Sequence, residues 1–186
     1  MSRVEIKIAG FGGQGVILAG MIVGRAAALY DGKDATLTQS FGPEARGGAC
    51  SAQLVLNSER NLYPCVVQPD ILVAMSQPAY DKFLPELKAG GMVLYESNLV
   101  SIRDQGSSLR QYGVPATRVA EDMGRKMVLN IVMLGFFTAM TEVVSAEAMT
   151  KAIQDSVPPG TTRLNIDAFK QGLQRGRQLL DESRDG

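Results

Sequence analysis

One stretch near the start of the chain, Ile8-Ala9-Gly10-Phe11-Gly12-Gly13-Gln14-Gly15, decides which fold the sequence predicts. Charged and apolar residues alternate before it, which indicates a strand. Residues 16–29 after it carry Arg25 as their only charge, which indicates a buried helix. Gly10, Gly12 and Gly15 have the spacing G-x-G-x-x-G between the two. The chain therefore begins with a strand, a tight glycine turn and a helix.

Apolar segments of strand and helix type alternate along the rest of the chain. We expect strands at residues 35–39, 50–57, 70–75, 92–95 and 116–120, and helices at about 78–87, 126–140, 146–156 and 167–183. Residues 104–112 are polar, and we expect them to be exposed. Such an alternation is typical of a mostly parallel sheet with helices on both faces. The prediction is one α/β domain over residues 1–186, a three-layer Rossmann-like fold.

The composition excludes several classes of function. The chain has 19 Lys and Arg against 19 Asp and Glu, so it lacks the basic excess of a protein that binds nucleic acid or an anionic membrane. It has no His, and Cys50 and Cys65 are too few for a four-cysteine metal or iron–sulfur site. We expect both thiols to be reduced, buried and inert.

The first residues and the longest apolar stretch indicate where in the cell we expect the protein. Residues 1–9 lack the apolar core of a signal peptide, and residues 127–140 are shorter than the roughly 20 residues that span a membrane. We expect a cytoplasmic protein and a buried helix.

The glycine turn has two interpretations. The backbone N–H groups of Gly12 to Gly15, with the helix dipole behind them, would favour an anion or a nucleotide. Alternatively, the glycines only permit a tight connection from strand to helix. A site for NAD would also need an acidic residue at the end of the second strand, where this sequence has Thr38-Gln39-Ser40.

A second cluster, Ser40-Phe41-Gly42-Pro43-Glu44-Ala45-Arg46-Gly47-Gly48, should lie at the same edge of the sheet as the glycine turn. Its Arg46 could present a guanidinium to a phosphate or a carboxylate. Alternatively, Glu44 and Arg46 pair with each other or the loop is simply solvated. The sequence shows no pattern for a self-contained active site, and we assign no catalytic residue.

These two clusters, together with Asp70-Ile71-Leu72-Val73-Ala74-Met75-Ser76-Gln77, resemble the gamma subunit of 2-oxoacid:ferredoxin (acceptor) oxidoreductases, most closely the 2-oxoglutarate type. The resemblance spans nearly the whole chain, and the Gly-Pro-Glu-x-Arg-Gly-Gly loop is its most specific part. It implies an accessory subunit of an enzyme that decarboxylates a 2-oxoacid oxidatively, passes electrons to ferredoxin and forms the acyl-CoA. The related indolepyruvate enzyme has a similar subunit, so the acid is left open.

The resemblance also implies the cofactors and partners. Thiamine diphosphate and iron–sulfur clusters belong to thiamine-binding and ferredoxin-like partner chains, none is bound by this chain, and coenzyme A is a co-substrate. A role in enclosing the active site or contacting CoA follows from the resemblance alone. The candidate residues for an anion or CoA are Gly10, Gly12, Gly13, Gln14, Gly15, Ser40, Gly42, Glu44, Arg46, Gly47 and Gly48. The isolated chain could also pair with itself.

Two hypotheses therefore stand. One is a non-catalytic subunit of such an oxidoreductase. The other is a free-standing nucleotide-binding or NAD-dependent oxidoreductase. The missing acidic residue after the second strand and the absence of His favour the subunit.

Overall fold

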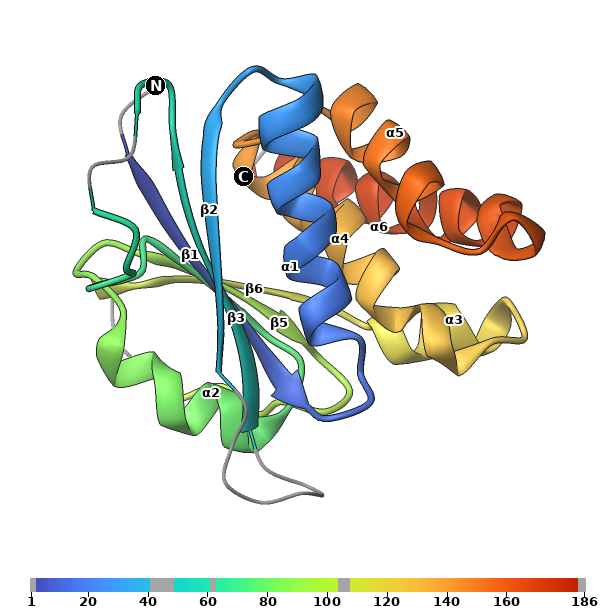
Figure 1. Ribbon diagram of the computed structural model, residues 1–186. Coiled ribbons are helices and arrows are strands. Elements are labelled where there is room, and N and C mark those ends of the chain that lie inside the picture. The colour runs from blue at the N-terminus through green and yellow to red at the C-terminus, as the bar shows by residue number, and fades with distance from the viewer. Residues whose placement is uncertain (1–2, 41–48, 61–62, 104–107, 184–186) are drawn as a thin grey trace.

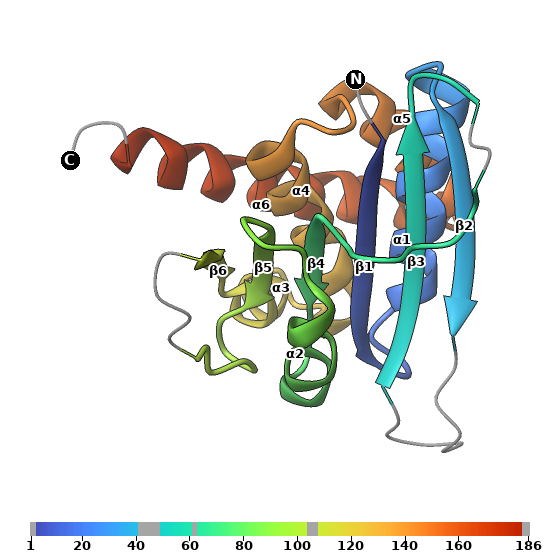
Figure 2. The same ribbon diagram turned by 90° about the vertical axis from the view of Figure 1, so that its left-hand side faces the viewer.

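The computed structural model describes residues 3–40, 49–60, 63–103 and 108–183. Six strands form one sheet in the order β2-β3-β1-β4-β5-β6 (Figures 1 and 2). The strands are β1 Val4–Phe11, β2 Asp34–Ser40, β3 Ala49–Asn57, β4 Ile71–Ala74, β5 Met92–Glu96 and β6 Arg110–Val114. The helices are α1 Val16–Arg25, α2 Gln77–Phe83, α3 Ala116–Asp122, α4 Leu129–Thr141, α5 Ala146–Ser156 and α6 Thr162–Glu182.

The sheet is mostly parallel. Strands β1, β4, β5 and β6 pair in parallel, whereas β3 is antiparallel to both β1 and β2. The connection between β2 and β3 is only residues 41–48, and a parallel crossover needs about a dozen residues or more. The chain must therefore return in the opposite direction, which makes β3 antiparallel to β2. Strand β3 also pairs with β1 and so lies between the two.

Helices cover both faces of this sheet. Helix α2 packs on one face, and α1, α3 and α4 lie on the other, with α5 and α6 outside them (Figure 1). The predicted three-layer α/β fold with a mostly parallel sheet is confirmed. Within the described ranges, every helix is too short or too polar to cross a lipid bilayer.

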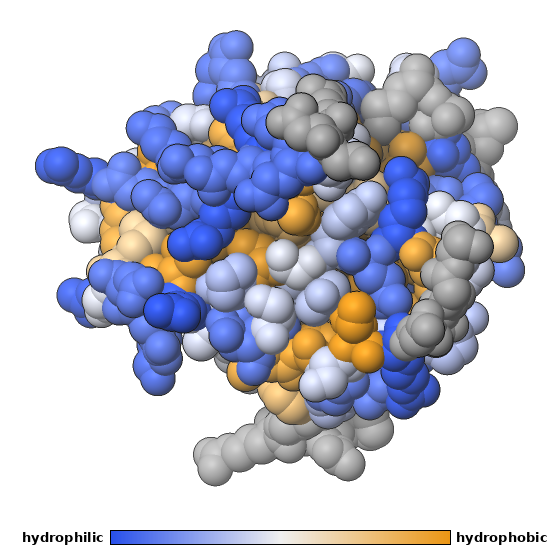
Figure 3. All heavy atoms as spheres, turned by 180° about the vertical axis from the view of Figure 1, so that it is seen from behind, coloured by the Kyte–Doolittle hydropathy of each residue, from blue (hydrophilic) through white to orange (hydrophobic). Residues whose placement is uncertain are grey.

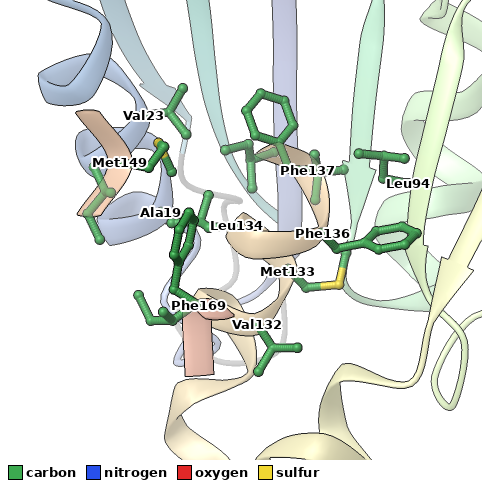
Figure 4. Close-up of a cluster of buried hydrophobic side chains, with 14 of the residues drawn as sticks. Ala19, Val23, Leu94, Val132, Met133, Leu134, Phe136, Phe137, Met149 and Phe169 are labelled. Atoms are coloured by element: carbon green, nitrogen blue, oxygen red, sulfur yellow. The ribbon is translucent and has the colours of Figure 1, made fainter. Parts of the chain in front are cut away.

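Helix α4 is the centre of the main core. Its side chains from Asn130 to Met140 are all buried, because other elements surround the helix. Phe136 lies beside Leu94 of β5, whereas Phe169 of α6 lies on the opposite side of α4, near Leu134 (Figure 4). On the face opposite to that in Figure 1, hydrophilic side chains predominate and apolar ones form small patches (Figure 3). The apolar residues thus face inward, as the alternating pattern predicted.

Helix α6 crosses α4 at very short range. A Cβ at Gly172 would lie 1.9 Å from the backbone oxygen of Val132, and one at Gly135 would lie 2.0 Å from the backbone oxygen of Phe169. Both positions therefore need glycine, because the two helix backbones are in direct contact.

One expectation about the middle of the chain is wrong, and another missed a strand: residues 104–107 of the polar segment lie outside the described residues, and Ser108 and Arg110 are exposed as expected. Residues 116–120, predicted as a strand, begin helix α3, and the sixth strand is β6, within and just after the segment expected to be polar and exposed. Strand β6 lies at the edge of the sheet, where polar side chains such as Arg110 and Gln111 are tolerated, so it lacks the apolar run of a central strand. Pro115 then separates strand from helix.

Candidate functional site

The glycine turn connects the carboxyl end of β1 to the amino end of α1. Gly13 and Gly15 have φ angles of 93° and 75°, a region that L side chains rarely adopt. The backbone N–H of Gln14 donates to the oxygen of Phe11 at 3.2 Å and closes the turn. The predicted tight turn is therefore present, and two of its glycines are required by backbone geometry.

The Gln14 side chain fastens this turn to the neighbouring strand. Its Oε1 accepts a hydrogen bond from the N–H of Phe11 at 2.6 Å, and its Nε2 donates to the oxygen of Met75 at 2.9 Å. A Cβ at Gly10 would lie 2.5 Å from that Oε1. Gly10 thus makes room for Gln14, and the Gln14 amide is used inside the protein.

Gly15 makes room for a second side chain in the same way. A Cβ at Gly15 would lie 2.3 Å from Nδ2 of Asn130, a buried residue in the first turn of α4. This Nδ2 donates to the backbone oxygen of Gly15 at 3.2 Å. The contact joins the glycine turn to the central helix.

Gly12 and Gly13 differ from the other glycines of the turn. Both are exposed, and a Cβ at either would have no atom within 4 Å. Gly12 also has no positive φ, so nothing in the described protein requires a glycine there. No side chain caps the adjacent start of α1, and its first turn has no acidic residue. This is the bare, electropositive backbone that an anion would approach.

The second cluster leaves the sheet at the same edge. Ser40, at the end of β2, pairs with Ser51, and the adjacent Cys50 pairs with Gly10. Two strand spacings, about 10 Å, therefore separate Ser40 from the start of the glycine turn. Ser40 is exposed. The remaining candidates of this cluster, Gly42, Glu44, Arg46, Gly47 and Gly48, lie outside the described residues.

Two polar residues at this edge serve as helix caps. The Ser76 hydroxyl accepts a hydrogen bond from the N–H of Ala79 in the first turn of α2. The fully buried Glu96 accepts one from the N–H of Thr117 in α3 at 3.1 Å, and its other carboxylate oxygen has no partner in the described protein. The Ser76 hydroxyl and one Glu96 oxygen are thereby engaged by the fold.

The two thiols have different environments. Cys50 is buried, and burial raises the pKa of its thiol. Cys65 is exposed, so the expectation that it is buried is wrong. Among the described residues, no three His, Cys, Asp or Glu side chains are grouped so as to hold a metal ion.

An apolar groove that the sequence did not reveal opens beside the glycine turn. It has a volume of about 590 Å³ and lies between Gly13 and Gly15 on one side and residues 125–130 and 157–165 on the other. These segments are far apart in the sequence, so no local pattern could have indicated the groove. Leu18 and Leu164 form part of its wall. We call it the apolar groove.

Comparison with known proteins relates the chain to one enzyme family. Residues 5–175 match the family described as pyruvate ferredoxin/flavodoxin oxidoreductase. The chain is 51% identical to 2-oxoglutarate synthase subunit KorC of Methanocaldococcus jannaschii over 179 residues, which cover 95% of this chain and 96% of that subunit.

The similar solved structures include those of two oxidoreductases. The gamma subunit of a keto/oxoacid ferredoxin oxidoreductase from Geobacter sulfurreducens is 41% identical, with a TM-score of 0.83 over 93% of this chain and 98% of that chain. The 2-oxoglutarate:ferredoxin oxidoreductase of Magnetococcus marinus, bound to 2-oxoglutarate, coenzyme A and succinyl-CoA, gives a TM-score of 0.87 at 22% identity. That match covers 96% of this chain and 32% of the other, and at this identity it shows the fold alone.

Proposed function

Because the chain belongs to the pyruvate ferredoxin/flavodoxin oxidoreductase family, we propose that it is the accessory gamma subunit of a 2-oxoacid:ferredoxin oxidoreductase that converts 2-oxoglutarate to succinyl-CoA. The observation that carries this proposal is the end-to-end match, at 51% identity, to a 2-oxoglutarate synthase subunit. A relative that matches over nearly its whole length and shares half of the aligned residues supports the proposal that this chain occupies the same subunit position in its complex.

The chemistry would belong to the partner chains. In this proposal, a thiamine-binding chain carries thiamine diphosphate, a ferredoxin-like chain carries iron–sulfur clusters, and ferredoxin is reached through the complex. The present chain contributes no catalytic residue. Its part is to complete the enclosure of the active site and to offer a surface to CoA.

The carboxyl edge of the sheet is the surface we assign to CoA. The exposed backbone of Gly12 and Gly13 at the uncapped start of α1 favours a phosphate, and the segment beginning at Ser40 leaves the sheet about 10 Å away. Arg46 on that segment would add a guanidinium. By contrast, Gly10, Gln14 and Gly15 would act indirectly, by fixing the shape of the turn.

The fold disfavours the alternative of an NAD-dependent enzyme. In a dinucleotide-binding unit the second strand lies beside the first, and an acidic residue at its end binds the ribose. Here β3 separates β1 from β2, and β2 ends in Gln39 and Ser40. The carboxylate is thus missing from both the sequence and the position where it would be needed.

Co-expression of a tagged chain with the other subunits tests this proposal. We expect the partner chains to co-purify, and the complex to reduce ferredoxin with 2-oxoglutarate and CoA faster than with pyruvate or indolepyruvate. The isolated chain should have no such activity. A tagged chain that recovers no oxidoreductase subunit, or turns over a 2-oxoacid alone, would show that the proposal is wrong.

Gly12→Leu tests the contact with CoA separately. The new side chain would enter open space, so we expect an unchanged melting temperature and an increased KM for CoA in the complex. An unchanged KM for CoA would remove the turn from the CoA site and leave the subunit assignment intact.

A further inference from the structure

The apolar groove has buried apolar side chains at its base and one exposed apolar side chain at its rim. Val128 and Val157 are almost completely buried within it, at 5% and 8% exposure. Met127, at its rim, is 89% exposed, the most exposed of the large apolar side chains in the described protein. The surface therefore combines a hollow with an adjacent apolar projection.

The charge on the residues that line the groove is positive. Arg125 is the only charged residue that lines it, and its guanidinium has no ion pair within the described residues. The neighbouring Lys126 already pairs with Glu121 at 2.7 Å, so that carboxylate is engaged. The opposite wall contains Gly13 and Gly15, at the start of α1. This helix start has no side-chain cap, so it also favours negative charge. An occupant should therefore be apolar and carry a carboxylate.

The projecting methionine distinguishes a protein from a small ligand. A small molecule in the groove would leave Met127 in water, whereas a protein surface would cover both the groove and the methionine. Methionine and arginine are also enriched at protein interfaces. The proposed function supplies a candidate, because a subunit must have partner chains.

Resting on that function, we propose that the apolar groove docks a segment of a partner subunit of the oxidoreductase. The segment would insert an apolar side chain over Val128 and Val157 and place an Asp or Glu against Arg125, while Met127 packs on its surface. This contact would hold the partner beside the glycine turn, and so next to the edge assigned to CoA.

Substitutions at the rim test the docking in the co-expressed complex. Met127→Glu adds a negative charge where an acidic segment should dock, and Arg125→Glu reverses the charge that attracts it. We expect each to reduce the partner subunits recovered with the tagged chain at least tenfold, and Arg125→Lys to retain most of them. Leu29→Glu is the matched control, because Leu29 is 67% exposed and lies just beyond the far end of α1.

Three measurements separate the outcomes. All four variants should melt at the temperature of the unaltered isolated chain, since the substituted side chains are exposed. Normal recovery of partners with Met127→Glu, or an equal loss with Leu29→Glu, would overturn the docking proposal. An intact Met127→Glu complex with a raised KM for CoA would overturn it in favour of a ligand site. If the unaltered chain recovers no oxidoreductase subunit, the proposed function itself fails.

Discussion

Replacing the glycines of the turn by alanine one at a time should give three different losses of stability. Gly12→Ala places a methyl group in open space at an ordinary φ, so we expect a change within about 0.5 kcal/mol. Gly13→Ala also meets no neighbour, but its φ of 93° is unfavourable for alanine and should cost about 1–2 kcal/mol.

Gly15→Ala should be the most harmful of the three. It combines the same backbone strain with a methyl group placed 2.3 Å from Nδ2 of Asn130. The amide must move away and lose its hydrogen bond to Gly15, which leaves a buried polar group unsatisfied at about 1–3 kcal/mol. We expect a total loss of about 2–5 kcal/mol, or about 4–20 °C in Tm for a chain of this size.

Urea and thermal unfolding of the isolated chain measure the loss of stability in the three Gly→Ala variants. A double variant tests whether the contact with Asn130 causes the larger loss at Gly15. In an Asn130→Ala background the clash is gone, so Gly15→Ala should cost only the strain, about 1–2 kcal/mol. A loss below about 1 kcal/mol for Gly15→Ala, or equal losses in both backgrounds, would refute the role of the Asn130 contact.

Three further predictions concern other parts of the fold. Gly172→Ala should destabilise by more than about 3 kcal/mol, because its methyl group would meet the backbone of Val132, which cannot rotate away; a Tm within 3 °C of the original would contradict this. Glu142→Gly should raise the Tm by about 2–4 °C, because Glu142 ends α4 with a φ of 50°; calorimetry would show an unchanged or lower Tm if its side chain stabilises the fold. Burial opposes the ionisation of Asp31, but two hydrogen bonds from Ser145 and the nearby positive charge of Lys33 together outweigh it and lower the pKa of this carboxyl group. The stability that this carboxylate contributes is therefore present above its unfolded pKa of about 4 and lost as the pH falls through its lower folded value. Urea titrations should show that the difference in unfolding free energy between the original chain and Asp31→Asn becomes smaller as the pH falls over that range. A difference that stays constant with pH would exclude a stabilising role of the ionised Asp31.

The sequence predicted the fold because its central strands are apolar on both faces. Strands β4 and β5 were found where uninterrupted apolar runs occur, and helix α5 begins and ends at the predicted residues. The reversal of β3 could also have been predicted, because residues 41–48 are too few for a crossover. Strand β6 was missed since an edge strand needs no apolar run, and residues 116–120 suit a strand or a helix equally well by composition.

The candidate site was less predictable because its contacts are long-range. The glycine spacing correctly indicated a tight turn, but the partner of Gln14 is Met75, and that of Gly15 is Asn130. Neither pairing leaves a local signal in the sequence. The exposed Met127 and the groove beside it likewise required the three-dimensional arrangement. The binding roles of the glycine turn and of Arg46 remain predictions.

The late position of α4 in the chain has a consequence for its biosynthesis. All six strands leave the ribosome before this helix, and until it arrives one apolar face of the nascent sheet lacks its central cover. At roughly 5–20 residues per second, synthesis from the end of β6 to the end of α4 takes about 1–5 s, and α6 needs about 2–8 s more. During that interval the nascent chain would be a substrate for chaperones that bind exposed apolar surface. A product truncated before Leu129 should aggregate rather than fold.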